Sequence, residues 1–198
     1  VTIVAYTDFE CPFCNRGRRS VEQLRKKYGD KIRVVLRHHP LPFHRNAMRA
    51  HLAAIAAGKQ GKLWQMHDKM FDDQRHLTDP SLRMMAQQLG LNVKRFDRDR
   101  ASASAKAIIT RDMASAKLVG VRGTPNFFFN GRKLVGAQPL NIMTMVVEEE
   151  LKKAKGRTGH GYYKRLMAKG NVFSALDSTV HRFETSTLPA TGPRNAKV

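Results

Sequence analysis

The sequence contains very little cysteine: Cys11 and Cys14 are the only two among 198 residues. This scarcity excludes a small scaffold that is held together by several disulfide bonds. Long apolar runs are missing as well, because no stretch approaches the roughly 18 consecutive apolar residues of a membrane-spanning helix. We therefore predict that this sequence has no integral membrane segment.

Acidic residues are also few, with 16 Asp and Glu against 36 Lys and Arg and a formal net charge of +20. Such a charge favours acidic partners, anionic membrane surfaces or nucleic acid. The basic residues are nevertheless scattered through the expected helices, without the aromatic-interleaved tract that is typical of a nucleic-acid groove. We predict a generally basic, solvated surface and no nucleic-acid partner.

A secretory leader is not present at the beginning of the sequence. Residues 1–6 already form an apolar run that is interrupted only by Thr2, which indicates a strand. We therefore expect the natural N-terminus to lie upstream, so that the missing leader does not indicate a compartment. Two cysteines at this spacing fit either a cytosolic reductant or a catalyst of an oxidising compartment.

The two cysteines form the motif Cys11-Pro12-Phe13-Cys14 between this strand and an expected helix over residues 16–28. Unpaired amide groups and the positive end of the helix dipole stabilise an anion at such a junction. A thiolate is such an anion, so we predict a lowered pKa for Cys11, with Arg16 and Arg18 as further causes. A CxxC motif between a strand and a helix is a specific indication of dithiol redox chemistry.

Two other interpretations of the motif are a structural disulfide and half of a zinc site. A disulfide across so short a loop constrains the unfolded chain very little. Zinc needs two more ligands, for which only histidines such as His38, His39 and His44 remain. We favour redox chemistry, interpret these histidines as local structure and predict no bound metal.

After the expected helix, the chain turns at Gly29-Asp30 and continues into a β-rich run over residues 31–38. A strand, a helix and a second strand make a βαβ unit, in which the two strands are parallel. Apolar spacing then predicts a block of helices, with Thr78 or Asp79 and Asn92 as caps. The expected helical ranges are 46–57, 61–71, 80–90, 92–96 and 101–118.

A tight loop over residues 120–125 precedes an expected strand over 126–129. Asn130-Gly131 is the strongest two-residue signal for a β-hairpin, so residues 132–135 should return antiparallel. A last helix is expected over residues 139–154.

Together these segments resemble the thioredoxin fold, and the helical insertion resembles that of the DsbA-like thiol–disulfide oxidoreductases. We predict an α/β protein: a thioredoxin fold with a helical insertion at about 44–100, between a βαβ half and a ββα half, in a domain over residues 1–155. The motifs that carry the resemblance are the segments 4–14, 39–41, 60–64, 120–125 and 131–138.

The resemblance implies that Cys11 attacks a disulfide and that Cys14 resolves the mixed disulfide. It also implies a cis peptide bond before Pro125, with Thr124 and Pro125 pairing with a substrate strand. The implied catalytic residues are Cys11 and Cys14, and the implied substrate-binding residues are Pro12, Phe13, Thr124 and Pro125. No cofactor is expected. The implied partners are cysteine-containing proteins and a redox partner protein that recycles the dithiol, in the periplasm or another extracytoplasmic compartment.

This sequence departs from the family pattern at two places. The central dipeptide is Pro12-Phe13 rather than the Pro-His of the strongest oxidants, so we expect a reduction potential between roughly −120 and −230 mV. Ala5 stands where the family often has a buried carboxylate that accepts the proton of the resolving thiol. Asp8 and Glu10 are candidates to replace that carboxylate, but we favour solvated loop charges for both.

A redox-silent binding module that uses its basic surface to hold a partner is the alternative function. The direction of the redox reaction (oxidation, reduction or isomerisation) also stays open, since CxxC chemistry runs both ways.

Residues 156–198 form an expected C-terminal extension that differs in composition from the domain before it. Residues 192–198 resemble the leader of a DsbA-like first strand, so we interpret the extension as a linker and the leader of a following tandem domain. The segment after about Ser174 should then be loosely held or should pair with the edge of another molecule. Packing of Phe173, Leu176 and Phe183 into this domain would contradict this interpretation.

Overall fold

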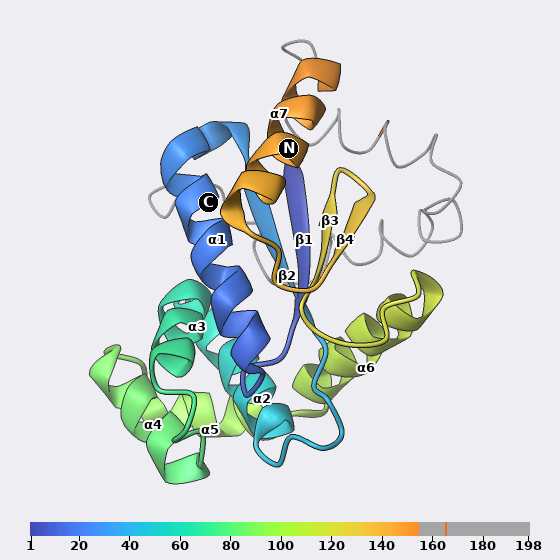
Figure 1. Cartoon of the computed structure of the whole chain (residues 1–198). Coiled ribbons are helices and arrows are strands. Elements are labelled where there is room, and N and C mark those ends of the chain that lie inside the picture. Colours follow the sequence, from blue (N-terminus) through green and yellow to red (C-terminus); the bar gives the residue numbers. More distant parts are fainter. Residues whose placement is uncertain (155–164, 166–198) are drawn as a thin grey trace.

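One mixed four-stranded sheet lies at the centre of the protein, in the order β2-β1-β3-β4 (Figure 1). The structure is a computed structural model, and it describes residues 1–154 and 165. β1 pairs parallel with β2 and antiparallel with β3, which pairs antiparallel with β4. The strands are β1 (Thr2–Thr7), β2 (Arg33–His38), β3 (Asn126–Phe129) and β4 (Arg132–Val135).

The helices confirm the predicted α/β class, with a βαβ half and a ββα half separated by a helical block. Helices α2 to α5 gather beyond one end of the sheet (Figure 1). The helices are α1 (Pro12–Tyr28), α2 (Ala47–Gly58), α3 (Leu63–Asp72), α4 (Asp79–Gln88), α5 (Val93–Ala101), α6 (Ala103–Leu118) and α7 (Leu140–Ala154), and a 3₁₀ turn covers Gly29–Lys31.

Side-chain caps fix several helix starts in the helical block. Thr78 accepts a hydrogen bond from the Ser81 amide and Asn92 accepts one from the Arg95 amide, as predicted. The helix expected over residues 101–118 is confirmed as α6, although it begins at Ala103 because the chain is extended at Ser102. The short segment expected over residues 92–96 instead continues to Ala101 as α5. The Ser102 hydroxyl accepts a hydrogen bond from the Ala105 amide, so this residue ends α5 and caps α6.

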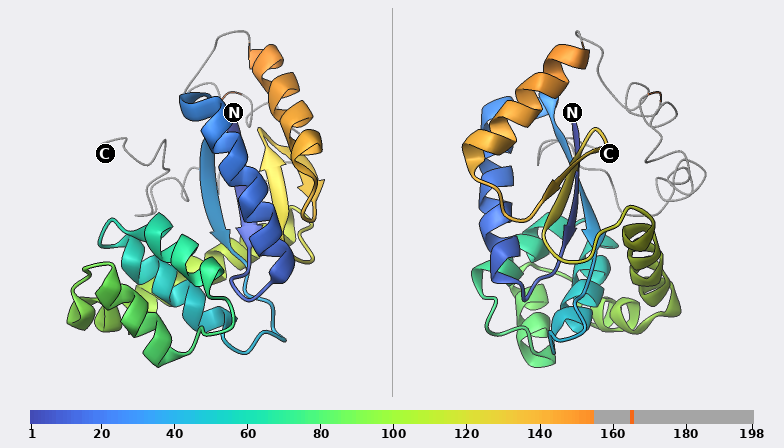
Figure 2. Two further views of the ribbon diagram at one scale, coloured as in Figure 1. Left: turned by 60° about the vertical axis from the view of Figure 1, so that its left-hand side comes forward. Right: turned by 45° about the vertical axis from the view of Figure 1, so that its right-hand side comes forward.

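The two faces of the sheet are covered by different helices (Figure 2). Ile3 and Phe127 pack with Leu24 of α1 and Val147 of α7 on one face. Tyr6 and Phe128 pack with Ala116 near the end of α6 on the other face. Neighbouring residues of a strand point to opposite faces, so Phe127 and Phe128 contribute to different cores.

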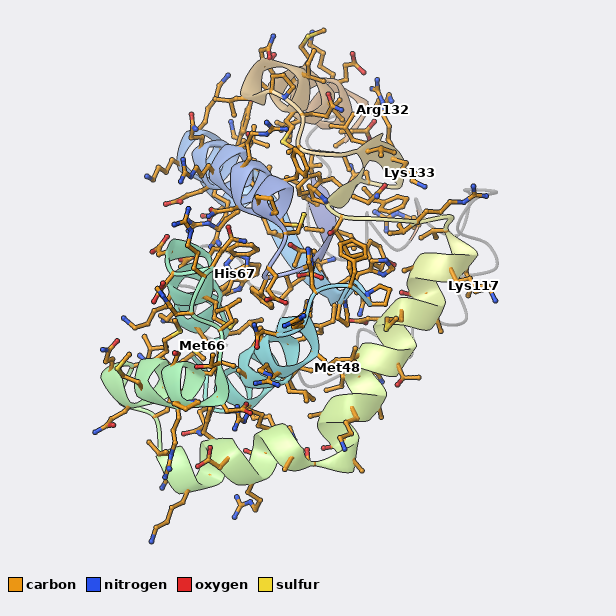
Figure 3. All side chains as sticks on the ribbon, turned by 60° about the horizontal axis from the view of Figure 1, so that its bottom comes forward. Met48, Met66, His67, Lys117, Arg132 and Lys133 are labelled. Carbon is orange, nitrogen blue, oxygen red and sulfur yellow. The ribbon has the colours of Figure 1, made fainter. Side chains whose placement is uncertain are left out.

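The β3–β4 hairpin confirms the prediction from Asn130-Gly131, since both residues have positive φ values, 47° and 97°. Lys133 on β4 (Figure 3) donates hydrogen bonds to the carbonyls of Val119 at 3.2 Å and Gly120 at 2.6 Å. These carbonyls lie at the C-terminal end of α6. The hairpin therefore holds the start of the loop that runs from α6 to β3.

The expectations for residues 156–198, namely the linker, the tandem leader and the packing of Phe173, Leu176 and Phe183, lie outside the described residues. Within the part of the chain that the structure describes, we find no helix that combines the length and the apolar character needed to cross a membrane.

Candidate active site

The CxxC motif lies where β1 leads into α1, as the sequence predicts. Cys11 is the N-cap residue of α1 and Pro12 occupies the first helical turn, where no amide hydrogen is needed. The Cys11 carbonyl accepts hydrogen bonds from the amides of Cys14 at 3.0 Å and Asn15 at 3.3 Å. Both cysteines are free thiols, and both are buried, with 4% and 2% of their surfaces exposed.

The loop before β3 comes back to these thiols. The Cys11 thiol donates to the Thr124 carbonyl over 3.5 Å, and the Thr124–Pro125 peptide bond is cis. Gly17 makes the close approach of α1 possible, because a Cβ there would lie 2.9 Å from the Phe127 ring and 3.3 Å from Pro125. Four of the predicted site residues, Cys11, Cys14, Thr124 and Pro125, are thus brought together, and the other two, Pro12 and Phe13, are exposed beside them.

The environments of the two thiols push their pKa values apart. The pKa of Cys11 is lowered to about 6, first by the hydrogen bond from Cys14, then by Thr124 and the amides of Cys14 and Phe13, against the opposing effect of burial. The pKa of Cys14 is raised, chiefly by burial and then by its interaction with Cys11. Such a pair has one thiolate ready to attack and one thiol that stays protonated.

Arginine side chains do not explain the lowered pKa of Cys11, so that part of the prediction is wrong. Arg18 is bound to Asp72 at 2.7 Å and lies 3.5 Å from Asp68. Arg16 stacks over the exposed Phe13 ring, 5.1 Å from its centroid. The helix end and the neighbouring thiol stabilise the anion instead.

The prediction that Asp8 and Glu10 are solvated is also wrong. Asp8 is fully buried, and its carboxylate accepts hydrogen bonds from the amides of Glu10 at 2.7 Å and Leu41 at 2.6 Å. His44 lies 3.0 Å from the same carboxylate. Glu10 accepts from the Asn46 amide at 2.6 Å. Both carboxylates therefore hold the loop after β2 against the CxxC segment.

Histidines near the site are parts of the packed interior. The Nδ1 atoms of His38 and His51 are 2.8 Å apart, and both side chains are fully buried. Burial lowers the pKa of His38 to about 4 and also lowers the pKa of His51. Among the described residues, no three His, Cys, Asp or Glu side chains are grouped so that they could hold a metal ion.

A cavity of about 280 Å³ adjoins Cys14, and sequence reasoning did not find it. Ala5 and Cys14 both line it, together with side chains of α1, β2 and α3, including His67 (Figure 3). His67 is bound to Asp68 at 3.0 Å, and burial lowers its pKa. The small side chain at position 5 thus leaves space beside Cys14 where a larger one would fit.

Two side-chain carboxamides that no sequence signal indicated, those of Gln74 and Asn15, also connect the CxxC region with the helical block. Gln74, just after α3, donates to the carbonyls of Phe9 and Cys11, and Asn15 donates to the carbonyl of Phe71. These contacts join the helical block directly to the thiol loop.

Comparison with known families supports this geometry. The family model of the DSBA-like thioredoxin domain matches residues 2–147. The chain belongs to the DSBA-like thioredoxin domain family.

Two solved structures resemble the DSBA-like domain at 26% sequence identity. A thioredoxin-like oxidoreductase from Silicibacter pomeroyi DSS-3 has a TM-score of 0.69, with 76% of this chain and 86% of that chain covered. A periplasmic thioredoxin-like protein from Salmonella enterica serovar Typhimurium has a TM-score of 0.63, with 76% and 84% covered. The DSBA-like domain is an oxidoreductase.

Curated relatives are named as ion transporters. The Na(+)/H(+) antiporter NhaA of Herminiimonas arsenicoxydans is 39% identical over 148 residues, which are 75% of this chain and 24% of that protein. The Na(+)/H(+) antiporter NhaA 3 of Salinispora tropica is 36% identical over 162 residues, 81% of this chain and 25% of that protein. The chain spans about a quarter of the length of these relatives, so the antiporter name describes proteins much longer than the matching domain.

Proposed function

We propose that this domain exchanges disulfides with cysteine-containing proteins through Cys11 and Cys14. The observation that carries the proposal is the placement of Cys11 as the N-cap of α1 and opposite the Thr124 carbonyl, with Cys14 buried one turn further on; this placement shifts the two thiol pKa values in opposite directions. A lowered pKa makes Cys11 a thiolate near neutral pH, and the thiolate is the attacking species in disulfide exchange.

In the reducing direction, the Cys11 thiolate attacks one sulfur of a substrate disulfide. A Cys11–substrate bond forms, the substrate S–S bond breaks, and the second substrate sulfur leaves as a thiolate that takes up a proton. Cys14 then loses its proton and attacks Cys11, which releases the first substrate sulfur. The substrate gains two electrons and the domain ends as a Cys11–Cys14 disulfide; oxidation of a substrate dithiol is the reverse sequence.

Substrate contacts are proposed for the four residues around the thiols. Pro12 and Phe13 are exposed next to Cys11, with 55% of Phe13 accessible. Thr124 and Pro125 lie across from Cys11, where a substrate strand would pair with the backbone of the loop. In this arrangement an extended peptide brings its sulfur to Cys11 while Phe13 covers an apolar side chain.

Catalysed reduction of insulin by dithiothreitol tests the proposal. The wild-type domain should accelerate the reaction, and Cys11→Ser should abolish the acceleration because the attacking sulfur is gone. Gln60→Met is a matched control within the helical block, since the Gln60 side chain bridges to the backbone of Asn92, away from the CxxC segment. Equal activity of wild type and Cys11→Ser would refute the proposal and leave the redox-silent binding module.

A protein partner that recycles the dithiol and an extracytoplasmic location complete the proposal. Support comes from the DSBA-like family and from the periplasmic protein among its structural neighbours. A membrane-impermeant thiol reagent should label Cys11 in intact cells that express the full parent protein. Labelling only after lysis would contradict the location.

A further inference from the structure

Gln74 lies in the turn after α3, and all but one of the hydrogen-bonding positions of its carboxamide are used. The Nε2 atom donates to the Phe9 carbonyl at 2.7 Å and to the Cys11 carbonyl at 3.1 Å. The Oε1 atom accepts from Asn15 Nδ2 at 3.0 Å. Two carbonyl acceptors on one side require the amino group there, so the network fixes the orientation of the carboxamide.

The Cys11 carbonyl that Gln74 binds is also the carbonyl that starts α1. It accepts the amides of Cys14 and Asn15, which are the first hydrogen bonds of the helix. Asn15 is held in turn by the Phe71 carbonyl, at 2.8 Å. Gln74 and Asn15 therefore connect the end of α3 to the residues just before α1 and to the first turn of α1.

We propose that Gln74 is a positioning residue for thiol–disulfide exchange: it holds the Cys11 backbone so that the amides of the first turn of α1 face the Cys11 sulfur. The inference rests on the proposed function, because it assigns a task to the helical block in the chemistry of Cys11. No sequence motif marks Gln74, which lies 63 residues from Cys11.

The physical reason is that amides stabilise a thiolate only when they point at it. The amides of Phe13 and Cys14 contribute to the lowered pKa of Cys11. Without Gln74, the carbonyls of Phe9 and Cys11 lose their shared donor, so fewer hydrogen bonds fix the turn between them. A stabilisation loss comparable to one hydrogen bond corresponds to a rise of roughly 0.5–1 pH unit in the pKa of Cys11.

Charged side chains joined to this network are already paired with other groups. Arg18 contacts Asn15 at 3.4 Å but is bound to Asp72, and Asp68 lies beside it. Glu10 is bound to Asn46 on the other side of the loop. A neutral substitution of Gln74 therefore changes the position of the amides without removing a charge.

The test compares Gln74→Met, Gln74→Glu and the control Gln60→Met by alkylation of the thiols as a function of pH. Methionine keeps the length of the side chain and removes its donors, whereas glutamate places a negative charge against two carbonyls. Gln60 makes a similar carboxamide bridge to Asn92, at 3.2 and 3.0 Å, without a hydrogen bond to the CxxC segment. The reduction potential against glutathione is the second measurement.

We expect the pKa of Cys11 to rise by roughly 0.5–1 unit in Gln74→Met and by more in Gln74→Glu. The equilibrium constant for forming the reduced domain should fall about three- to tenfold, which corresponds to roughly 15–30 mV. Gln60→Met should leave both quantities at their wild-type values. If Gln74→Met does not fold, Gln74→Ala takes its place, since it only truncates a half-buried side chain.

A wild-type pKa and potential in a folded Gln74 variant would overturn the inference. So would an equal shift in Gln60→Met, because that result would indicate a general loosening of the helical block. Thiol titration needs no protein substrate, so it tests Gln74 independently of the proposed function. Failure of the wild-type domain to reduce insulin would refute the function alone.

Discussion

Replacement of Cys14 tests how the pKa of Cys11 is set. The hydrogen bond from Cys14 is the largest cause of the lowered pKa, so Cys14→Ala removes that cause and leaves the opposing effect of burial. A hydrogen bond to a charged group contributes about 1.5–3 kcal/mol, and one pKa unit corresponds to about 1.4 kcal/mol. We therefore expect the pKa of Cys11 to rise from about 6 by roughly 1–2 units.

Cys14→Ser is the matched control, since its hydroxyl still donates a hydrogen bond. The rise there should be smaller than in Cys14→Ala. The assay is the rate of alkylation against pH, and its interpretation is simple because Cys11 is the only thiol left in either variant. A midpoint for Cys14→Ala within about half a unit of the wild-type value would refute the reasoning and show that the backbone amides suffice.

The same pKa shift links the stability of the reduced domain to pH. A group whose pKa is lowered on folding stabilises the folded state above its unfolded pKa, and this contribution is lost as pH falls through the folded pKa. The free energy of unfolding of the reduced domain should therefore rise between pH 6 and 9, by at most about 4 kcal/mol. The rise should be smaller in Cys14→Ala, and urea denaturation at several pH values measures it. An equal rise in both would contradict the assignment to Cys11.

Three further substitutions test the packing around the thiols. Asp8→Asn should lower the free energy of unfolding by about 2–4 kcal/mol, since the amino group that replaces one carboxylate oxygen cannot accept from the amide of Glu10 or Leu41; a decrease below about 0.5 kcal/mol in urea denaturation would contradict this. Gly17→Ala should destabilise by about 1 kcal/mol, because the contact with Phe127 outweighs the gain in helix propensity, and a more stable variant would show that α1 can shift. Ala5→Glu should place a carboxylate in the cavity beside Cys14 and change the pH dependence of the resolving step, measured in single turnovers between about pH 5 and 8; an unchanged profile would mean that the new side chain points elsewhere.

Features that depend on neighbouring residues were predictable from the sequence. The strands, the hairpin at Asn130-Gly131 and the caps at Thr78 and Asn92 are local, so a few residues determine each of them. The CxxC position follows from the same reasoning, because it needs only a strand before it and a helix after it.

Features that depend on distant contacts were not predictable in this way. Asp8 looks like a solvated loop charge until the Leu41 amide, 33 residues away, is brought to it. Gln74 lies in an ordinary turn, and its contact with Cys11 exists only when α3 packs beside α1. The cavity next to Ala5 likewise results from the packing of α1, α3 and β2 against each other. Tertiary packing, and not local sequence, completes the site.

Capture of the mixed disulfide tests the central claim most directly. Cys14→Ala should attack a disulfide of a substrate protein with Cys11 and stop there, because the resolving thiol is missing. Mass spectrometry should then find a covalent adduct on Cys11 that disappears on reduction, whereas Cys11→Ala should form none. An adduct that forms equally well on Cys11→Ala, or none on Cys14→Ala, would contradict the assignment of Cys11 as the attacking thiol.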